Sequence, residues 1–181
     1  LPFDETSGST AHDLSGYGNT GTATGTTIVD GVFGKARSFD GLDDYVSIPT
    51  SAELQALTSS TDWSIGCFVK TTQTGAADLW TPGIIEKRAL EQWGDRVFVV
   101  SIDTNGKAQF GYVEHETQTS YFAVSTTTVN DGNWHFIVGV NDNGTYRLYV
   151  DGVQEDTVAG SYSQSSSDGI TVGCRRTDLG D

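Results

Sequence analysis

The chain has 181 residues, which fits one domain, and its 24 acidic and 10 basic side chains give a net charge of −14. Such a surface repels nucleic-acid phosphates, and no apolar run reaches the length of a membrane-spanning helix, so we expect neither nucleic-acid binding nor membrane insertion. Abundant Gly, Ser and Thr with only three prolines favour many strands joined by tight turns.

The first half of the chain gives few signals of regular structure. Residues 5–27 are rich in Gly, Ser, Thr and Asn, and we expect an irregular surface segment there. Ser51 is placed to cap one or two helical turns over residues 51–57. Polar residues and glycine interrupt any hydrophobic period over 71–83 and 86–96, so both are expected to be longer loops.

The second half predicts an antiparallel meander. Asn-Gly and Asp-Gly pairs tolerate the positive φ angles of a type I′ turn, and four of them stand beside alternating apolar runs. These pairs begin at Asn105, Asp131, Asn143 and Asp151. The expected strands cover residues 97–103, 108–113, 134–140 and 146–150. The predicted class is therefore all-β and antiparallel. A further irregular segment is expected over 160–168.

Alternation along the strands indicates which side chains share a face. Cys67 shares a face with Ile65 and Val69, and Cys174 shares one with two apolar neighbours on its own strand. Both cysteines are therefore expected to point at a core, where they form either a disulfide or two buried free thiols. Trp63 and Trp134 are also assigned to the core.

Four phrases, in order along nearly the whole chain, resemble the bacterial laminin-G-like (LamG), concanavalin A-type family, with a more distant pentraxin-like resemblance. They are Phe3-Asp-Glu-Thr-Ser-Gly8 with Asp13-Leu-Ser-Gly-Tyr-Gly-Asn19, then Gly31 to Pro49, Trp63 to Lys70, and Asp131-Gly-Asn-Trp-His135 with Arg147 to Gly152. The resemblance implies a jelly-roll sandwich of one convex and one concave antiparallel sheet. It also implies that glycans bind on the concave sheet or its rim loops, with calcium nearby.

The chain departs from this family after the segment 170–173. Members usually close the sandwich there with an apolar strand of the kind Phe-x-Gly-x-Ile-Asp-Glu-Val, and none follows in this sequence. Only Leu1-Pro2-Phe3 precedes Asp4 at the other end. We therefore expect one domain over 1–181 that is truncated at both ends, or whose closing strand comes from a neighbouring chain.

Calcium is the metal that carboxylate-rich turns would hold. Asp40, Asp43 and Asp44 crowd a turn beside a glycine, and Ca²⁺ prefers carboxylate and carbonyl oxygens. The alternative is an ordinary turn with solvated acids. A second candidate site pairs Asp95 with Asp178, in loops comparable with the calcium loops of pentraxins, although basic residues near both would repel a cation.

A glycan site needs exposed aromatic faces beside polar groups. Trp80 and Trp93 lie in polar stretches that give them no obvious core role. On the strand 110–116, alternation puts Tyr112 with Glu114, whose charge suggests a solvent-exposed face. The full set of expected ligand-binding residues is Trp80, Trp93, Tyr112, Glu114, His115 and Phe68. Ordinary packing is the alternative for each.

Catalysis is not expected. Glu114 and Glu116 have the spacing of two acids on one strand face, which a retaining glycosidase would need. However, the Glu-x-Asp-x-x-Glu signature of laminarinase-type hydrolases is absent, and no zinc motif or nucleophile elbow occurs.

We therefore expect an extracellular module that binds a glycan or glycosylated surface, assisted by calcium, for adhesion or substrate targeting. Modest site affinity would favour tandem domains or a homo-oligomer. The alternative is a structural or assembly module of a surface layer, filament or virion, acting through sheet edges.

Overall fold

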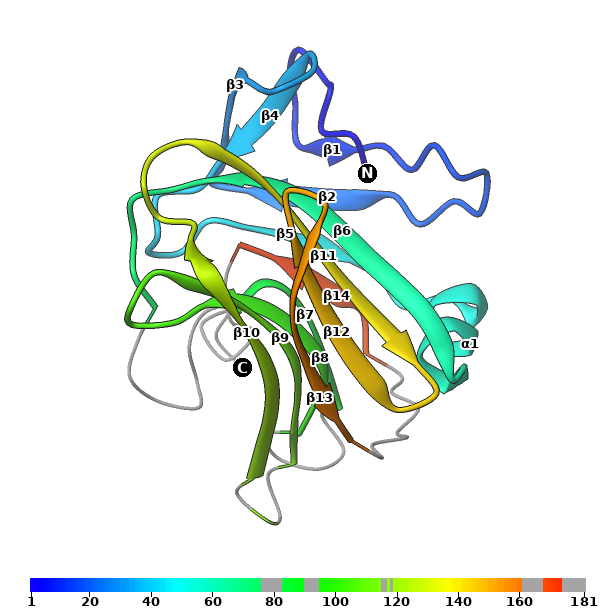
Figure 1. The fold of residues 1–181 in the computed structure, drawn as a ribbon. Helices are drawn as coiled ribbons and strands as arrows, with labels where there is room; N and C mark the ends of the chain where they lie inside the picture. The colour runs from blue at the N-terminus through cyan, green and yellow to red at the C-terminus, as the bar shows by residue number, and fades with distance from the viewer. Residues whose placement is uncertain (76–82, 90–94, 115–116, 118, 161–167, 174–181) are drawn as a thin grey trace.

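The computed structural model describes residues 1–75, 83–89, 95–114, 117, 119–160 and 168–173. The strands form two antiparallel sheets that pack face to face, with a small hairpin and one helix at the margins (Figure 1). The all-β, two-sheet sandwich predicted from the sequence is therefore confirmed.

The larger sheet has eight strands in the order β1-β2-β5-β14-β7-β8-β9-β10. Its strands are β1 (Thr10–Ala11), β2 (Gly21–Thr24), β5 (Tyr45–Ile48), β7 (Gly83–Ala89), β8 (Asp95–Ile102), β9 (Lys107–Glu114), β10 (Thr119–Thr128) and β14 (Ile170–Val172). Because β14 pairs with both β5 and β7, the end of the described chain joins its first third to its middle.

The smaller sheet has four strands in the order β13-β12-β11-β6. Its strands are β6 (Asp62–Lys70), β11 (Trp134–Asp142), β12 (Thr145–Val150) and β13 (Val153–Ala159), and a separate hairpin consists of β3 (Thr27–Asp30) and β4 (Lys35–Ser38). Helix α1 (Ala52–Ser59) begins where Ser51 predicted it, since the Ser51 hydroxyl accepts the amide of Leu54 at 3.1 Å. Within the described residues, no helix is long and apolar enough to span a membrane.

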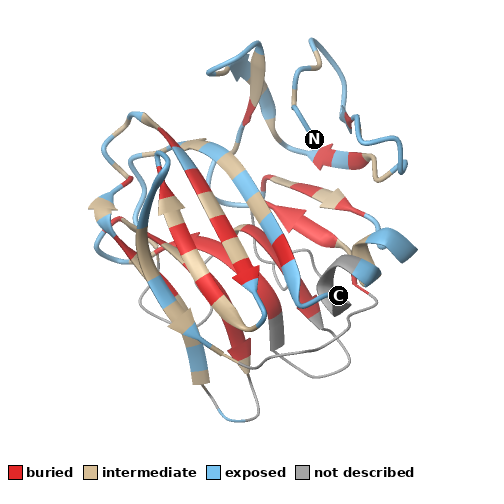
Figure 2. Ribbon diagram, turned by 45° about the vertical axis from the view of Figure 1, so that its right-hand side comes forward, coloured by how far each residue is buried: buried red, intermediate tan, exposed pale blue. Residues whose placement is uncertain are grey.

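The core between the sheets is built around aromatic rings. Trp63 on β6 reaches the larger sheet, where its ring centroid lies 5.2 Å from that of Phe98 and 5.7 Å from that of Phe110. Tyr146 on β12 packs against Phe110 at 5.6 Å. Along β6 and β11, more exposed residues alternate with more buried ones (Figure 2). Each of these strands therefore has one inner face toward the core and one outer face.

The hairpin turns agree with the sequence in part. Asn143 and Gly144 have φ angles of 47° and 82°, and Asp151 has 52° with a glycine at 85° behind it. Both pairs therefore have the two positive φ angles of a type I′ turn. At Asn105-Gly106 and Asp131-Gly132 only the glycines have positive φ, so the type I′ prediction is wrong for those two turns.

Two segments expected to be irregular contain strands. Residues 5–27 include β1 and β2, and residues 86–96 include the end of β7 and the start of β8. Glu86 and Lys87 are 1% and 0% exposed, although a run of charged residues normally indicates a solvent-exposed segment. Arg88 donates to Glu86 at 3.0 Å, and Lys87 donates to the carbonyl of Asp168. These partners compensate the buried charges, which polarity alone could not reveal.

Candidate functional site

Several residues predicted for the site lie outside the described part of the chain. They are Trp80, Trp93, His115, Cys174 and Asp178. Asp95 begins β8, but its side chain is not described. The stacking role of the two loop tryptophans and the second calcium site therefore stay predictions.

Tyr112 lies in the core. Its side chain is 1% exposed, and its ring centroid lies 4.7 Å from that of Tyr121 and 5.1 Å from that of Tyr146. The expectation of a solvent-exposed Tyr112 is therefore wrong. Glu114 gave a misleading signal because it is the last residue of β9, where it is half-buried and accepts the Thr117 hydroxyl at 3.0 Å.

The two tryptophans assigned to the core are in different environments. Trp63 is 8% exposed and confirmed as a core residue, whereas Trp134 is half-buried on the outer face of β11. The prediction for Trp134 is wrong because its neighbour His135 takes the inward position. His135 is 9% exposed, since two carboxylates satisfy both nitrogens of its ring.

Exposed aromatic side chains gather at one end of the smaller sheet's outer face. Phe68 and Phe136 stand opposite each other on β6 and β11, with stacked rings 4.6 Å apart. Phe33, in the turn of the β3–β4 hairpin, packs its ring against Phe68 at 5.8 Å. Trp134 follows on the same face, opposite Lys70. We call Phe33, Phe68, Trp134 and Phe136 the aromatic platform.

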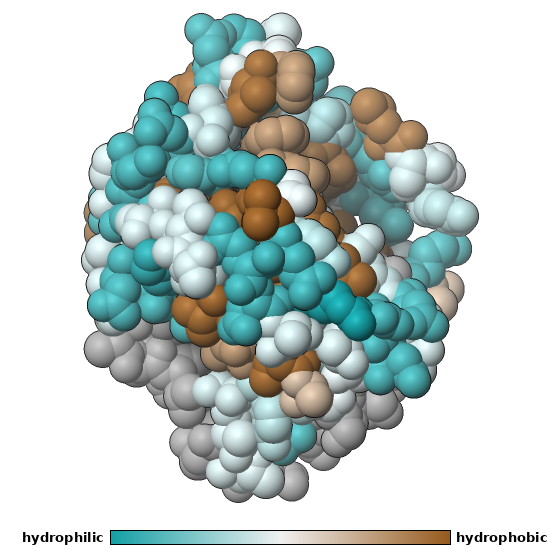
Figure 3. Space-filling view, in the orientation of Figure 1, coloured by the Kyte–Doolittle hydropathy of each residue, from teal (hydrophilic) through white to brown (hydrophobic). Residues whose placement is uncertain are grey.

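The platform is open to solvent. Phe33, Phe68 and Phe136 are 78%, 47% and 36% exposed. Hydrophobic surface is visible around the hairpin and the neighbouring part of the smaller sheet, separated by hydrophilic surface (Figure 3). Of the predicted ligand-binding residues whose side chains are described, Phe68 is the one that lies on this surface. Sequence reasoning did not assign the other three to a site, because the pairing of β6 with β11 and the packing of the hairpin bring them together over long distances in the sequence.

Two local features position Phe136. Gly66 lies beside it on β6, where an added Cβ would approach the ring to 3.3 Å, so the glycine leaves room for the ring. On the other side, the Asp151 carboxylate accepts the amide of Phe136 at 2.8 Å, and the Asp151 amide donates to the Phe136 carbonyl at 2.9 Å. The glycine therefore leaves room for the ring, and the two hydrogen bonds fix the backbone that carries it.

A cluster of charged groups supports this end of β11. His135 Nδ1 lies 2.7 Å from Asp151 and its Nε2 lies 3.1 Å from Asp131. Hydrogen bonds from the backbone and side chain of Asn133, followed by that from His135, lower the pKa of Asp131 to about 2. Burial lowers the pKa of His135, but the hydrogen bonds to both carboxylates outweigh it and raise the pKa. The raised pKa and the two carboxylate acceptors both favour the imidazolium form of His135.

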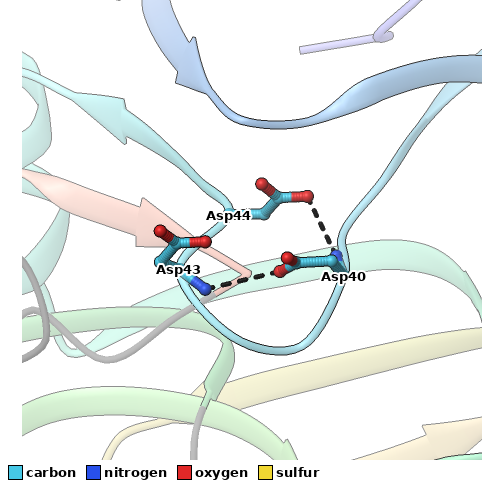
Figure 4. Close-up of side chains that lie close together, drawn as sticks. All are labelled: Asp40, Asp43 and Asp44. Atoms are coloured by element: carbon cyan, nitrogen blue, oxygen red, sulfur yellow. Dashed lines mark hydrogen bonds between the residues drawn. The ribbon is translucent and has the colours of Figure 1, made fainter.

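The predicted calcium turn brings its three acids together. Carboxylate oxygens of Asp40, Asp43 and Asp44 lie within 4.8 Å of one another (Figure 4). The amide of Leu42 donates to Asp40 at 2.8 Å, which lowers the pKa of Asp40. Asp44 is buried and accepts the amide of Asp40 at 2.9 Å. This hydrogen bond within the turn helps to fix the position of the Asp44 carboxylate.

The turn offers a donor set that suits a hard cation. All three side chains supply oxygen, which Ca²⁺ prefers. Gly25 makes the arrangement possible, because an added Cβ there would lie 1.8 Å from an oxygen of Asp44. The residues therefore fit the group that the family resemblance implies.

Cys67 points toward the core from β6, as predicted, and is a free thiol. Burial raises the pKa of this thiol to about 12, so it is a poor nucleophile. Of the two alternatives that the sequence left open, the free thiol is the one found for Cys67, and Cys174 itself lies outside the described residues. The catalytic pair considered above is likewise untested, since Glu116 lies outside the described residues.

Comparison with protein families assigns this architecture to a class. The profile of the concanavalin A-like lectin/glucanases superfamily, Laminin_G_3, matches residues 39–180, and the chain belongs to this family. The family membership predicted from the sequence is thus confirmed. No curated protein matches the sequence.

Solved structures share the fold at low sequence identity. Domain 4 of AbnA, an extracellular GH43 arabinanase from Geobacillus stearothermophilus in complex with arabinotriose, matches with TM-score 0.69 and 17% identity over 89% of this chain and 76% of that one. The carbohydrate-binding module CBM66 from Bacillus subtilis matches with TM-score 0.51 and 15% identity over 84% and 86%. Domains LG4-5 of the mouse laminin α1 chain match with TM-score 0.53 and 12% identity, over 74% of this chain and 33% of that one.

Proposed function

We propose that this chain is a carbohydrate-binding module whose ligand rests on the aromatic platform. The observation that carries the proposal is the exposure of Phe33, Phe68 and Phe136, with the ring of Phe68 in contact with both of the others. Apolar faces of sugar rings pack on such surfaces, while hydroxyl groups bond to nearby carboxylates. The complex of a similar fold with arabinotriose supports the class of ligand.

The proposed module binds and does not catalyse. Its setting is extracellular, where it would serve adhesion or target an attached enzyme to a substrate. The names of the similar structures, an extracellular arabinanase domain, a carbohydrate-binding module and a laminin, support this setting. Attachment to further domains or a homo-oligomer would raise the avidity of a modest site.

Isothermal titration against a panel of oligosaccharides that includes arabinotriose tests the proposal. Phe68→Ala and Phe136→Ala should each weaken binding at least about tenfold, or about 1.4 kcal/mol. Tyr17→Ala is a matched control, since Tyr17 is 68% exposed and outside the platform. Equal affinities for all four proteins would place the ligand elsewhere, and no binding to any oligosaccharide would refute the function.

We further propose that Asp40, Asp43 and Asp44 bind Ca²⁺ and thereby stabilise the turn before β5. Three carboxylates close together repel one another, and a divalent cation removes that repulsion. Melting curves should show a rise of about 2–8 °C in saturating calcium relative to chelator. Asp43→Asn should abolish the rise, because its carboxylate accepts no hydrogen bond among the described residues and its loss leaves the turn intact.

Asp62→Asn provides a control for the calcium experiment, because Asp62 is exposed on β6 and distant from this turn in the sequence. Its calcium-dependent rise should equal that of the unmodified protein. A melting temperature independent of millimolar calcium would rule out the site.

A further inference from the structure

We infer that the aromatic platform selects uncharged glycans and excludes acidic ones. This inference rests on the proposed function and concerns the chemical class of its ligand. It depends on the charges that border the aromatic platform. A sulfated or uronate-rich chain needs unpaired cations, whereas the charges beside this platform are mainly anions and paired cations.

In the part of the chain that the structure describes, the cations at this surface are few and mostly paired already. On the β3–β4 hairpin, Lys35 Nζ lies 2.7 Å from the carboxylate of Asp30. On the outer face of the smaller sheet, Arg147 is paired with Asp142. Among the described residues, Lys70 is the cation beside the platform without an ion-pair partner. One such charge is a weak counterpart for a polyanion.

The anions at this surface are fixed in their ionised state. Asp131 and Asp151 both bind the His135 ring beside Trp134 and Phe136. The pKa of Asp131 is about 2, and hydrogen bonds from Phe136 and His135 outweigh burial and lower the pKa of Asp151. Both groups therefore remain negatively charged at neutral pH, and the single positive charge that His135 carries when protonated leaves the cluster net negative.

The whole molecule adds to this local repulsion. Its net charge of −14 gives a negative field, which opposes the approach of an acidic polysaccharide at low and moderate ionic strength. An uncharged sugar pays no such cost. Its apolar face contacts the rings, and its hydroxyl groups donate hydrogen bonds to carboxylate oxygens at the border.

Salt dependence separates the two classes of ligand. Binding of arabinotriose, an uncharged probe, should change less than about twofold between 50 and 500 mM NaCl, because no ion pairs form. Heparin and polygalacturonate oligomers should show no measurable binding at 50 mM NaCl, where attraction to a basic site would be strongest. Titration calorimetry of the full chain measures both.

The outcomes separate this inference from the proposed function. If acidic oligomers bind and Phe68→Ala abolishes that binding while Tyr17→Ala does not, the platform is a glycan site but the selection for uncharged ligands is wrong. If uncharged probes bind and the Phe68 and Phe136 variants bind equally well, the site itself is wrong. If no glycan of either charge binds, the proposed function fails. Amide shifts of Phe68 and Phe136 on adding arabinotriose give a readout in the unmodified protein.

Discussion

His135 is the residue whose charge most directly affects β11. Each ring nitrogen faces a carboxylate oxygen, of Asp151 at 2.7 Å and of Asp131 at 3.1 Å. An acceptor on both sides requires a proton on both nitrogens, so the neutral ring would leave one contact between two lone pairs. The folded protein therefore binds a proton here more tightly than the unfolded chain does, whose histidine has the ordinary pKa of 6.5.

This difference makes stability depend on pH in a defined direction. Because the folded pKa is raised, the stabilisation by His135 is complete below pH 6.5 and is lost as pH rises through the folded pKa. The melting temperature of the wild type should exceed that of His135→Gln at pH 5.5, and the gap should narrow toward pH 9. His12→Gln, a change at an exposed histidine, should show no such trend. A gap that is constant across this range would disprove the imidazolium.

His135 also shows why the sequence did not predict which face of β11 points to the core. Alternation correctly groups Trp134 with Phe136 and His135 with Ile137, but it does not say which group faces the core. Hydrophobicity favours the tryptophan face, and the structure has the opposite arrangement. The partners that allow His135 to be buried come from turns at 131 and 151, and a strand pattern does not include them.

At the level of elements, carboxylates of β13 join it to β10 of the other sheet. The Glu155 carboxylate accepts the amides of Thr126 and Thr127 at 2.6 and 2.7 Å, together with both hydroxyl groups. Asp156 accepts the amide of Val124 at 2.8 Å. These acids occupy backbone donors of β10, which forms one edge of the larger sheet, and so connect the two sheets along one side of the sandwich.

Glu155→Gln should destabilise the protein by about 1–3 kcal/mol, because a charged acceptor of several hydrogen bonds is lost. Burial raises the pKa of Glu155, but hydrogen bonds from Thr127 and Thr126 outweigh it and lower the pKa below its ordinary 4.5. The stabilisation is thus present above pH 4.5 and is lost as pH falls through the folded pKa. Urea unfolding at pH 7 and at pH 3 measures the difference between the two proteins, which should shrink at pH 3.

Gln154→Ala on the same strand is the control for that measurement, since Gln154 is exposed and bonds only the Tyr149 hydroxyl among the described residues. It should change the free energy of unfolding by less than about 0.5 kcal/mol. If Gln154→Ala lowered the free energy of unfolding as much as Glu155→Gln, the effect would come from any change on β13 and not from the Glu155 carboxylate.

Elements were predictable from sequence where local chemistry decides them. The turns at Asn143 and Asp151 and the helix start at Ser51 depend on residues within a few positions of each other. The strand β7 was missed because its charged residues are buried through partners such as Asp168, 81 positions away from Lys87. Contacts of that range leave no periodic signal.

On the scale of the whole molecule, family phrases determined the sandwich, but not the surface that it presents. Phe33 reaches the platform because the β3–β4 hairpin folds back toward β6, and Phe33 and Phe68 are 35 positions apart in the sequence. Each residue separately reads as an ordinary exposed aromatic side chain. The site becomes visible only when the hairpin and the sheet are placed together.

Two tryptophans of the smaller sheet test which of its faces packs in the core and which faces solvent. Trp63 contacts rings of the larger sheet and is 8% exposed, so Trp63→Ala should cost about 3–5 kcal/mol of unfolding free energy. Trp134 is half-buried on the outer face, and Trp134→Ala should cost less than about 1 kcal/mol while weakening glycan binding. Urea unfolding followed by circular dichroism compares identical substitutions on adjacent strands. Equal losses for the two variants would place both tryptophans in the core and remove Trp134 from the platform.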